Sequence, residues 1–188
     1  MLSRRTLLQA TAAAGCGFAI ASTGHAQSTL NAHSFAFGRP EGGEMPLAAY
    51  RGRPILIVNT ATRCGLAGQF ATLEQLWQRY QDRGLMLIAV PSNDFGGQEP
   101  LDGLAIAQAV RQSHGVSYTF AEKSRVRGPE AHPFYRWAAA QRPQEVPSWN
   151  FHKYLVGRDG ELVGGFSSTT DPISPRLVQA IGGELQQG

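Results

Sequence analysis

The chain has 188 residues, of which 42% are hydrophobic and 16% are charged. This length allows one domain with a sizeable core, with or without a removable segment. The formal net charge is +3, but residues 27–188 carry 15 basic and 14 acidic side chains, because Arg4 and Arg5 are the only charged residues before them. No block of like charges occurs in this near-neutral part, which argues against a nucleic acid partner and against binding to an acidic membrane surface.

The first 26 residues have the pattern of an export signal. Arg4 and Arg5 form a twin-arginine pair, an alanine-rich apolar run follows, and the segment ends in Gly-His-Ala, which suits signal peptidase. The apolar run is too short and too interrupted by Gly and Thr to span a bilayer comfortably. We therefore predict a cleaved twin-arginine signal peptide at 1–26 and an exported, periplasmic domain at 27–188 that is not stably inserted into a membrane.

The cysteine count constrains the chemistry further. Cys16 lies inside the predicted signal peptide, and an apolar stretch follows it where a lipidated cysteine would have a polar tether, so we interpret it as an incidental small hydrophobe. Cys64 is then the only thiol of the mature chain. No intrachain disulfide, no cysteine-based metal site and no thioredoxin-type dithiol exchange is possible with a single cysteine.

Patterns in the first half predict a hairpin followed by strand, helix and strand. Residues 31–50 mix aromatic side chains with Gly, Pro and Glu and predict a short hairpin. Residues 55–58 and 85–90 are unbroken apolar runs, typical of strands buried on both faces. Between them, apolar residues recur with helical spacing over 66–80, and Gly84 provides a left-handed end. This order predicts a right-handed parallel crossover.

Cys64 lies just after the first of these strands and just before the predicted helix. The unpaired amides at a helix start favour a thiolate over a thiol, and the charge of Arg63 acts in the same direction. This context indicates a nucleophilic or redox-active cysteine. The alternative is a buried structural cysteine, since free cysteines are often core residues.

The second half alternates helical and strand patterns. In chain order, we expect a helix at 103–114 capped by Asp102 and ended by Gly115, a strand at 118–120, a helix within 126–141, strands at 151–156 and 161–166, and a helix from Pro175 capped by Ser174. The Asp-Gly step between the last two strands signals a hairpin turn. His114, His132 and His152 lack ligand spacing, so we predict no metal site.

Together these elements predict an α/β, thioredoxin-like fold. Its central mixed sheet would have about four or five strands, with helices on both faces. No internal repeat or second domain boundary is found. The thiol would lie at the carboxyl end of a central strand, where open α/β sheets place their sites.

Three separated blocks carry the most specific signal in the sequence. They read V-N-T-A-T-R-C-G-L at residues 58–66, P-S-N-D-F-G-G-Q-E-P at residues 91–100, and W-N-F at residues 149–151. These blocks, in this order, resemble the three signature blocks of the glutathione peroxidase family. The resemblance extends from about Phe35 to Pro172, which is nearly all of the predicted mature domain.

The resemblance implies a thiol-dependent peroxidase that protects against oxidative stress. It assigns Cys64, Gln98, Trp149 and Asn150 to the family's catalytic tetrad. The Cys64 thiolate would attack a hydroperoxide and become a sulfenic acid, while amide and indole N–H groups hold the thiolate and assist the leaving oxygen. Without the resemblance, a core aromatic residue is the favoured interpretation of Trp149, and Gln98 and Asn150 have the alternative interpretation of turn residues.

The resemblance also bears on the reductant. Relatives that use thioredoxin often carry a resolving cysteine at the stretch that corresponds to residues 107–113, and many have cysteine at Ser92; this chain has neither. Both reducing thiols must then come from outside, from glutathione, another small thiol or a thioredoxin-type protein. We expect no cofactor. We also predict a monomer, because the segment between Trp137 and Trp149 lacks the insertion that supports tetramers in larger relatives.

Two other functions are compatible with a single reactive cysteine. A non-catalytic peroxide sensor or thiol relay would form a mixed disulfide between Cys64 and a partner protein. A thiol-dependent transferase on the same fold would modify electrophiles without reducing peroxide. Repeated consumption of hydroperoxide distinguishes the peroxidase from both.

Overall fold

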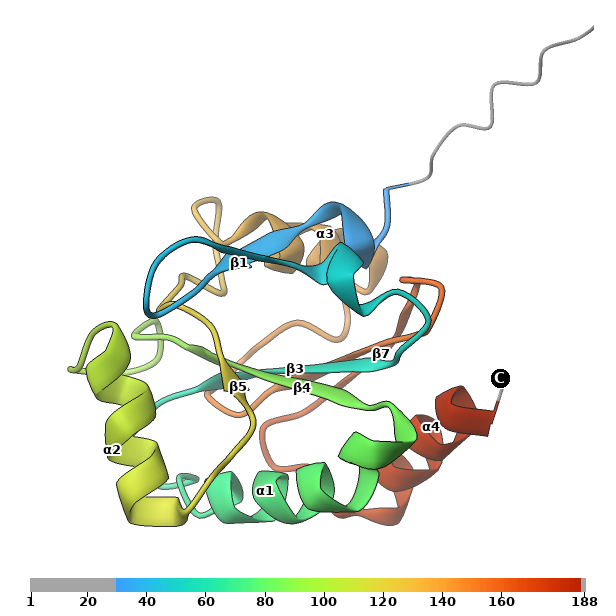
Figure 1. The fold of residues 1–188 in the computed structure, drawn as a ribbon. Coiled ribbons are helices and arrows are strands. Elements are labelled where there is room, and N and C mark those ends of the chain that lie inside the picture. Colours follow the sequence, from blue (N-terminus) through green and yellow to red (C-terminus); the bar gives the residue numbers. More distant parts are fainter. Residues whose placement is uncertain (1–29, 187–188) are drawn as a thin grey trace, which may run out of the picture.

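The computed structural model describes residues 30–186, so the predicted signal peptide, its cleavage site and Cys16 lie outside the described residues. A five-stranded sheet forms the centre of this part of the chain (Figure 1). Its strands are β3 (Ile55–Thr60), β4 (Met86–Pro91), β5 (Thr119–Phe120), β6 (Lys153–Val156) and β7 (Leu162–Phe166). The sheet is mixed, as predicted.

The spatial order of the strands is β5-β4-β3-β6-β7. β3 pairs in parallel with β4, and β4 pairs in parallel with β5. β6 pairs antiparallel with both β3 and β7. Every residue of β3 and β4 is buried, as expected for interior strands that are covered on both faces. β3 is therefore the central strand, and Cys64 follows its carboxyl end.

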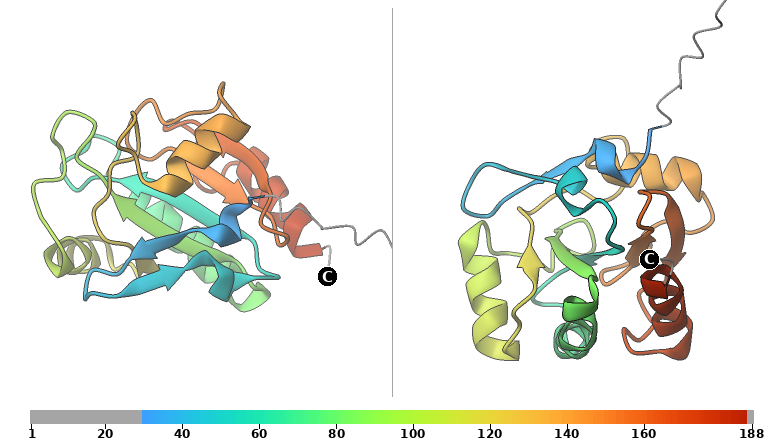
Figure 2. Two further views of the ribbon diagram at one scale, coloured as in Figure 1. Left: turned by 90° about the horizontal axis from the view of Figure 1, so that it is seen from above. Right: turned by 45° about the vertical axis from the view of Figure 1, so that its right-hand side comes forward.

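Helices cover both faces of the sheet. The helices are α1 (Gln69–Tyr80), α2 (Leu104–His114), α3 (Pro133–Gln141) and α4 (Pro175–Gln186), with 3-10 turns η1 (Ala32–Ser34), η2 (Leu47–Tyr50) and η3 (Gln81–Arg83). The antiparallel hairpin of β1 (Ala36–Gly38) and β2 (Glu44–Pro46) forms where it was predicted. The hairpin and α3 lie on one side of the sheet and α1, α2 and α4 on the other, as the turned views of Figure 2 also show.

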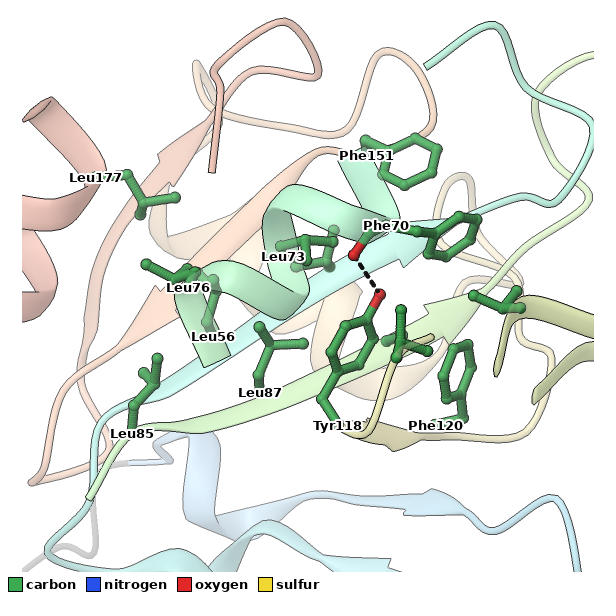
Figure 3. Packing of buried hydrophobic residues seen from close by; sticks show 14 of the residues in the cluster. Leu56, Phe70, Leu73, Leu76, Leu85, Leu87, Tyr118, Phe120, Phe151 and Leu177 are labelled. Carbon is green, nitrogen blue, oxygen red and sulfur yellow. Dashed lines mark hydrogen bonds between the residues drawn. The ribbon is translucent and has the colours of Figure 1, made fainter. Parts of the chain in front are cut away.

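Two buried clusters hold these layers together. Successive strand residues face opposite sides, so Leu56 and Val58 belong to the cluster under α1, whereas Ile55 and Ile57 belong to the cluster under α3. In the first cluster, the side chains of α1 pack over strand leucines, and Tyr118 Oη donates a hydrogen bond to the Phe70 carbonyl oxygen at 3.4 Å (Figure 3). Burial of each such leucine or phenylalanine stabilises the fold by about 1.5–3 kcal/mol.

The predicted start of α1 is wrong. The helix begins at Gln69, not at residue 66, because the chain after Cys64 first makes a series of turns. Ala67 N–H donates to the Cys64 carbonyl oxygen at 2.9 Å, and Gln69 N–H donates to that of Leu66 at 2.9 Å. Bonds between residues three apart belong to tight turns and not to an α-helix. Cys64 is therefore one turn further from α1 than predicted.

Both predicted side-chain caps are also wrong. The N-cap of α2 is Gly103, without a side-chain hydrogen bond, and the Asp102 carboxylate forms an ion pair with Lys123. α4 begins at Pro175 as predicted, but Ser174 Oγ has no hydrogen-bond partner in the described part of the chain. Gly115 ends α2 in the left-handed conformation as predicted, with φ 66°. Gly84 is also left-handed, with φ 106°, but it ends the 3-10 turn η3, since α1 itself stops at Tyr80.

Candidate active site

Cys64 lies in the turns between β3 and α1. It is a free cysteine with 7% of its surface exposed. Its Sγ atom accepts a hydrogen bond from Leu66 N–H at 3.4 Å, and such a donor stabilises negative charge on sulfur. The N–H group beside the sulfur is therefore that of a turn residue and not, as predicted, one at the start of α1. The Arg63 side chain is exposed, so solvent screens the effect of its charge on the sulfur.

Gln98 lies in the loop between β4 and α2, close to the Cys64 turn. Arg63 N–H donates a hydrogen bond to the Gln98 carbonyl oxygen at 2.9 Å. The peptide unit between Thr62 and Arg63 therefore contacts the loop of Gln98 directly. Gly96 and Gly97 turn this loop with φ values of 68° and 65°, a conformation that glycine adopts at little cost.

Asn150 connects the third sequence block to Gln98. Its Nδ2 donates to Gln98 Oε1 at 2.9 Å, and Asn150 itself is fully buried. Because Gln98 Oε1 is an acceptor in this bond, the Gln98 amide nitrogen retains its two hydrogens for other partners. Asn150 and Gln98 are thus bonded to each other, and Gln98 is bonded to Arg63, the residue before Cys64.

Trp149 lies at the surface above the same loop, with 41% of its area exposed. Its ring packs against Phe95, with centroids 5.9 Å apart. A methyl group placed on Gly96 would lie 3.6 Å from Gln98 Cγ and 3.7 Å from Trp149 Cη2. The Gln98 and Trp149 side chains therefore flank the same glycine. The exposure of Trp149 excludes a role in the core.

Asn59, to which the sequence interpretation gave no role, holds the third block in place. Asn59, at 0% exposure in β3, donates from Nδ2 to the Trp149 carbonyl oxygen at 3.1 Å, and its own carbonyl accepts from Phe151 N–H at 2.6 Å. Phe151 has φ 66° and is the one non-glycine residue with positive φ in residues 30–186. Its ring packs on Phe70 at 5.0 Å, so core burial offsets this backbone strain (Figure 3). A polar residue inside a buried strand was the available signal for Asn59.

Lys153 is a fully buried cation below this region. Its Nζ donates to Gln69 Oε1 and to the Thr170 carbonyl oxygen, both at 2.6 Å. Burial lowers the pKa of Lys153 to about 7, although the charge of Asp171 acts in the opposite direction. Because Gln69 is the first residue of α1, Lys153 connects β6 to the helix that follows Cys64. The sequence signal was a charged residue in an otherwise buried strand.

The three predicted non-ligand histidines lie apart. His132 caps α3, His114 packs beside Phe70, and His152 packs on Tyr154. No group of three or more potential metal-ligating side chains occurs within residues 30–186. None of the helices in this range has the length and apolar character needed to cross a bilayer.

Comparison with known proteins identifies the family. The family model described as glutathione peroxidase matches residues 32–139. The chain belongs to the glutathione peroxidase family. It is accordingly an oxidoreductase of the peroxidase class. The match ends before Trp149 and so does not include the third block, which contacts Gln98 and Asn59 in the structure.

Several relatives support this membership. A glutathione peroxidase-like peroxiredoxin of Chlamydomonas reinhardtii is 41% identical over 136 residues, which cover 71% of this chain and 84% of the relative. A glutathione peroxidase of Lactococcus lactis subsp. cremoris is 32% identical over 146 residues, covering 76% of this chain and 93% of the relative.

Solved structures confirm the thioredoxin-like fold predicted for this glutathione peroxidase family member. The apo crystal structure of Trgpx is 28% identical, with a TM-score of 0.69 over 84% of this chain and 97% of its own. A thiol:disulfide interchange protein of the thioredoxin family from Chlorobium tepidum is 15% identical, with a TM-score of 0.58 over 82% of this chain and 95% of its own. The second likeness concerns the fold alone.

Proposed function

We propose that this glutathione peroxidase family member reduces hydroperoxides through a sulfenic acid on Cys64. The Cys64 thiolate attacks the distal oxygen of the hydroperoxide, an S–O bond forms as the O–O bond breaks, and the departing alkoxide or hydroxide takes a proton. The observation that carries this proposal is the bonded set of Arg63 to Gln98 and Gln98 to Asn150 beside the free thiol.

The other three members of the proposed tetrad support the reaction at Cys64. The Gln98 amide and the Trp149 indole N–H donate to the sulfur and to the leaving oxygen, where negative charge develops. Asn150 orients Gln98 by donating to its Oε1. Cys64 is only slightly exposed, which admits a small hydroperoxide group and limits access of bulky electrophiles. This restriction supports a peroxidase over the transferase alternative.

The sulfenic acid returns to the thiol in two exchanges. One external thiol condenses with it, releasing water and forming a mixed disulfide, and a second thiol displaces Cys64 as the external disulfide leaves. Since Cys64 is the only cysteine of residues 27–188, both thiols come from glutathione, another small thiol or a thioredoxin-type protein. The cycle uses no bound cofactor, and activity is expected to survive dialysis against a metal chelator.

The decisive experiment is steady-state peroxide consumption by the protein, first with glutathione and then with a thioredoxin system. We expect repeated turnover with at least one reductant and complete loss in Cys64→Ser, because a hydroxyl cannot replace the thiolate. Activity that survives this substitution refutes the mechanism.

The same assay tests the sensor or relay alternative. That alternative predicts consumption of one equivalent of peroxide, followed by a stable mixed disulfide between Cys64 and a partner protein. Several equivalents consumed per protein exclude it.

We further propose that the protein works as an exported monomer acting against oxidative stress. The twin-arginine pattern at Arg4 and Arg5 supports periplasmic export. Replacement of both arginines by lysine is expected to retain the protein in the cytoplasm, as measured by cell fractionation. Light scattering of the purified protein measures its molar mass in solution and tests whether it is a monomer.

A further inference from the structure

The Glu99 carboxylate joins the two loops that carry Cys64 and Gln98. Glu99 is 0% exposed and directly follows Gln98 in the chain. Its Oε2 accepts a hydrogen bond from Thr62 N–H at 2.9 Å, and its Oε1 accepts one from Thr62 Oγ1 at 3.0 Å. Thr62 lies two residues before Cys64. The carboxylate therefore links the segment just before Cys64 to the residue just after Gln98.

Glu99 is also held from its own side of the site. Its Oε1 accepts a further hydrogen bond from Leu101 N–H at 3.3 Å, and its backbone N–H donates to Asn93 Oδ1 at 2.9 Å. None of the salt bridges found in residues 30–186 includes Glu99, so all of its side-chain partners are neutral donors. The Lys123 ammonium lies 3.5 Å from the Glu99 backbone carbonyl oxygen, but its ion pair is with Asp102. Burial of a carboxylate that has no paired cation is unfavourable unless its hydrogen bonds compensate for it.

We propose that Glu99 is a positioning residue that sets Gln98 against Cys64 during peroxide reduction. This inference rests on the function proposed above. The backbone bond from Arg63 to Gln98 joins the two loops at one point, and the paired bonds to Thr62 join them at a second. Two points of attachment prevent one loop from rotating on the other. A displacement of about 1 Å at a reacting group can slow a reaction about 100-fold.

Glu99→Gln removes the negative charge of the side chain. An electrostatic role and a positioning role of Glu99 predict different effects of this change on the reactions of Cys64. A negative charge near Cys64 disfavours the thiolate, so Glu99→Gln should by electrostatics alone leave thiol reactivity unchanged or raise it. Glutamine, however, has one acceptor oxygen where the carboxylate has two, and its NH2 group cannot accept a hydrogen bond, so the bond from either Thr62 N–H or Leu101 N–H is lost. A slower reaction with peroxide at undiminished thiol reactivity therefore identifies positioning.

The test measures two rate constants of the reduced protein in single-turnover experiments: oxidation of Cys64 by hydrogen peroxide, and its alkylation by iodoacetamide. Glu99→Gln should lower the peroxide constant about 10- to 100-fold and change the alkylation constant less than about twofold. Glu74→Gln is the matched control. Glu74 accepts from Ser117 N–H at 2.8 Å and from Ser117 Oγ at 2.7 Å, the same bond pattern on another part of the fold. It should change neither constant.

Further variants test whether Glu99 acts through Gln98. The double variant Gln98→Ala/Glu99→Gln should react with peroxide no more slowly than Gln98→Ala alone, because coupled residues are not additive. Thr62→Val, which removes only the hydroxyl bond, should lower the peroxide constant, and Thr62→Ser should restore it. These Thr62 variants carry the test if Glu99→Gln fails to fold.

Three results would each overturn the inference. They are an unchanged peroxide constant in Glu99→Gln, an equal fall of the peroxide and alkylation constants, and full additivity with Gln98→Ala. By contrast, peroxide reduction that persists in Cys64→Ser overturns the proposed function itself, so the two failures are distinguishable.

Discussion

Single residues near Cys64 adopt backbone conformations that most side chains avoid. Gly96, with φ 68°, turns the loop that brings Gln98 beside Trp149, whereas Phe151, with φ 66°, reverses the chain just after Asn150. Glycine tolerates this region freely, but a phenylalanine there is strained and has to be held by its surroundings. The site therefore depends on Gly96, which adopts a positive φ at little cost, and on Phe151, whose buried ring holds it in the same conformation.

Gly96→Ala tests the backbone requirement. The added methyl group meets only ordinary contacts at 3.6 and 3.7 Å, so the positive φ is the dominant penalty. We expect the free energy of unfolding to fall by about 1–2 kcal/mol. The control is Gly68→Ala, because Gly68 has φ −55° and open space around its Cβ position, and a neutral or slightly stabilising effect is expected. Urea unfolding of both variants measures the difference. Equal stabilities would contradict the argument.

At the scale of elements, Lys153 links β6, α1 and the loop that contains Thr170. Its pKa of about 7 in the folded protein lies below its ordinary value of 10.5. The unfolded chain therefore binds more protons between these two values, and stability rises as the pH increases through this window. Burial of the cation opposes folding most strongly below pH 7.

Lys153→Met should abolish this rise. From pH 7 to pH 9 the wild-type protein is expected to gain about 2 kcal/mol of unfolding free energy, whereas the variant should gain little. The buried tyrosines, whose pKa values are raised, do not titrate in this range. Lys123→Met is the control, since Lys123 is partly exposed and paired with Asp102. Denaturant unfolding at the two pH values gives the comparison, and a variant with the full rise would disprove the assignment.

For the whole molecule, three buried or partly buried histidines contribute to the response to acid. Burial lowers the pKa values of His33, His132 and His152, and that of His152 falls to about 4 with an added contribution from the charge of Lys153. Each histidine is neutral in the folded state where the unfolded chain is protonated. Stability is therefore lost as the pH falls from 6.5 towards 4.

His152→Gln should reduce this acid sensitivity. Between pH 7 and pH 5 the His152 contribution amounts to a loss of about 2 kcal/mol in the wild-type protein, and glutamine does not titrate. The variant should therefore lose less stability over this interval, as measured by thermal or urea unfolding at each pH. An unchanged difference between the two pH values would show that His152 is not the group responsible.

Much of the fold could be predicted because its strands, helices and turns have recognisable local sequence patterns. Unbroken apolar runs predicted β3 and β4, helical spacing predicted α1, and the Asp-Gly step predicted the β6-β7 hairpin. The errors lie at helix starts, at Gln69 and Asp102, because turns and ion pairs compete there with helical capping at small differences in free energy. The signal peptide prediction falls outside residues 30–186 and stays a prediction.

By itself, the sequence determined the fold class and the position of Cys64 after the central strand, and its resemblance to the glutathione peroxidase family supplied the candidate residues Gln98, Trp149 and Asn150. Only the tertiary structure decided how these are held: Asn150 on Gln98, Asn59 on the Trp149 backbone, and Glu99 on Thr62. Local patterns record which residues are buried and where helices form. Hydrogen bonds between residues that lie 37 to 90 positions apart produce no periodic pattern in the sequence, because they form only when the sheet brings the strand ends together.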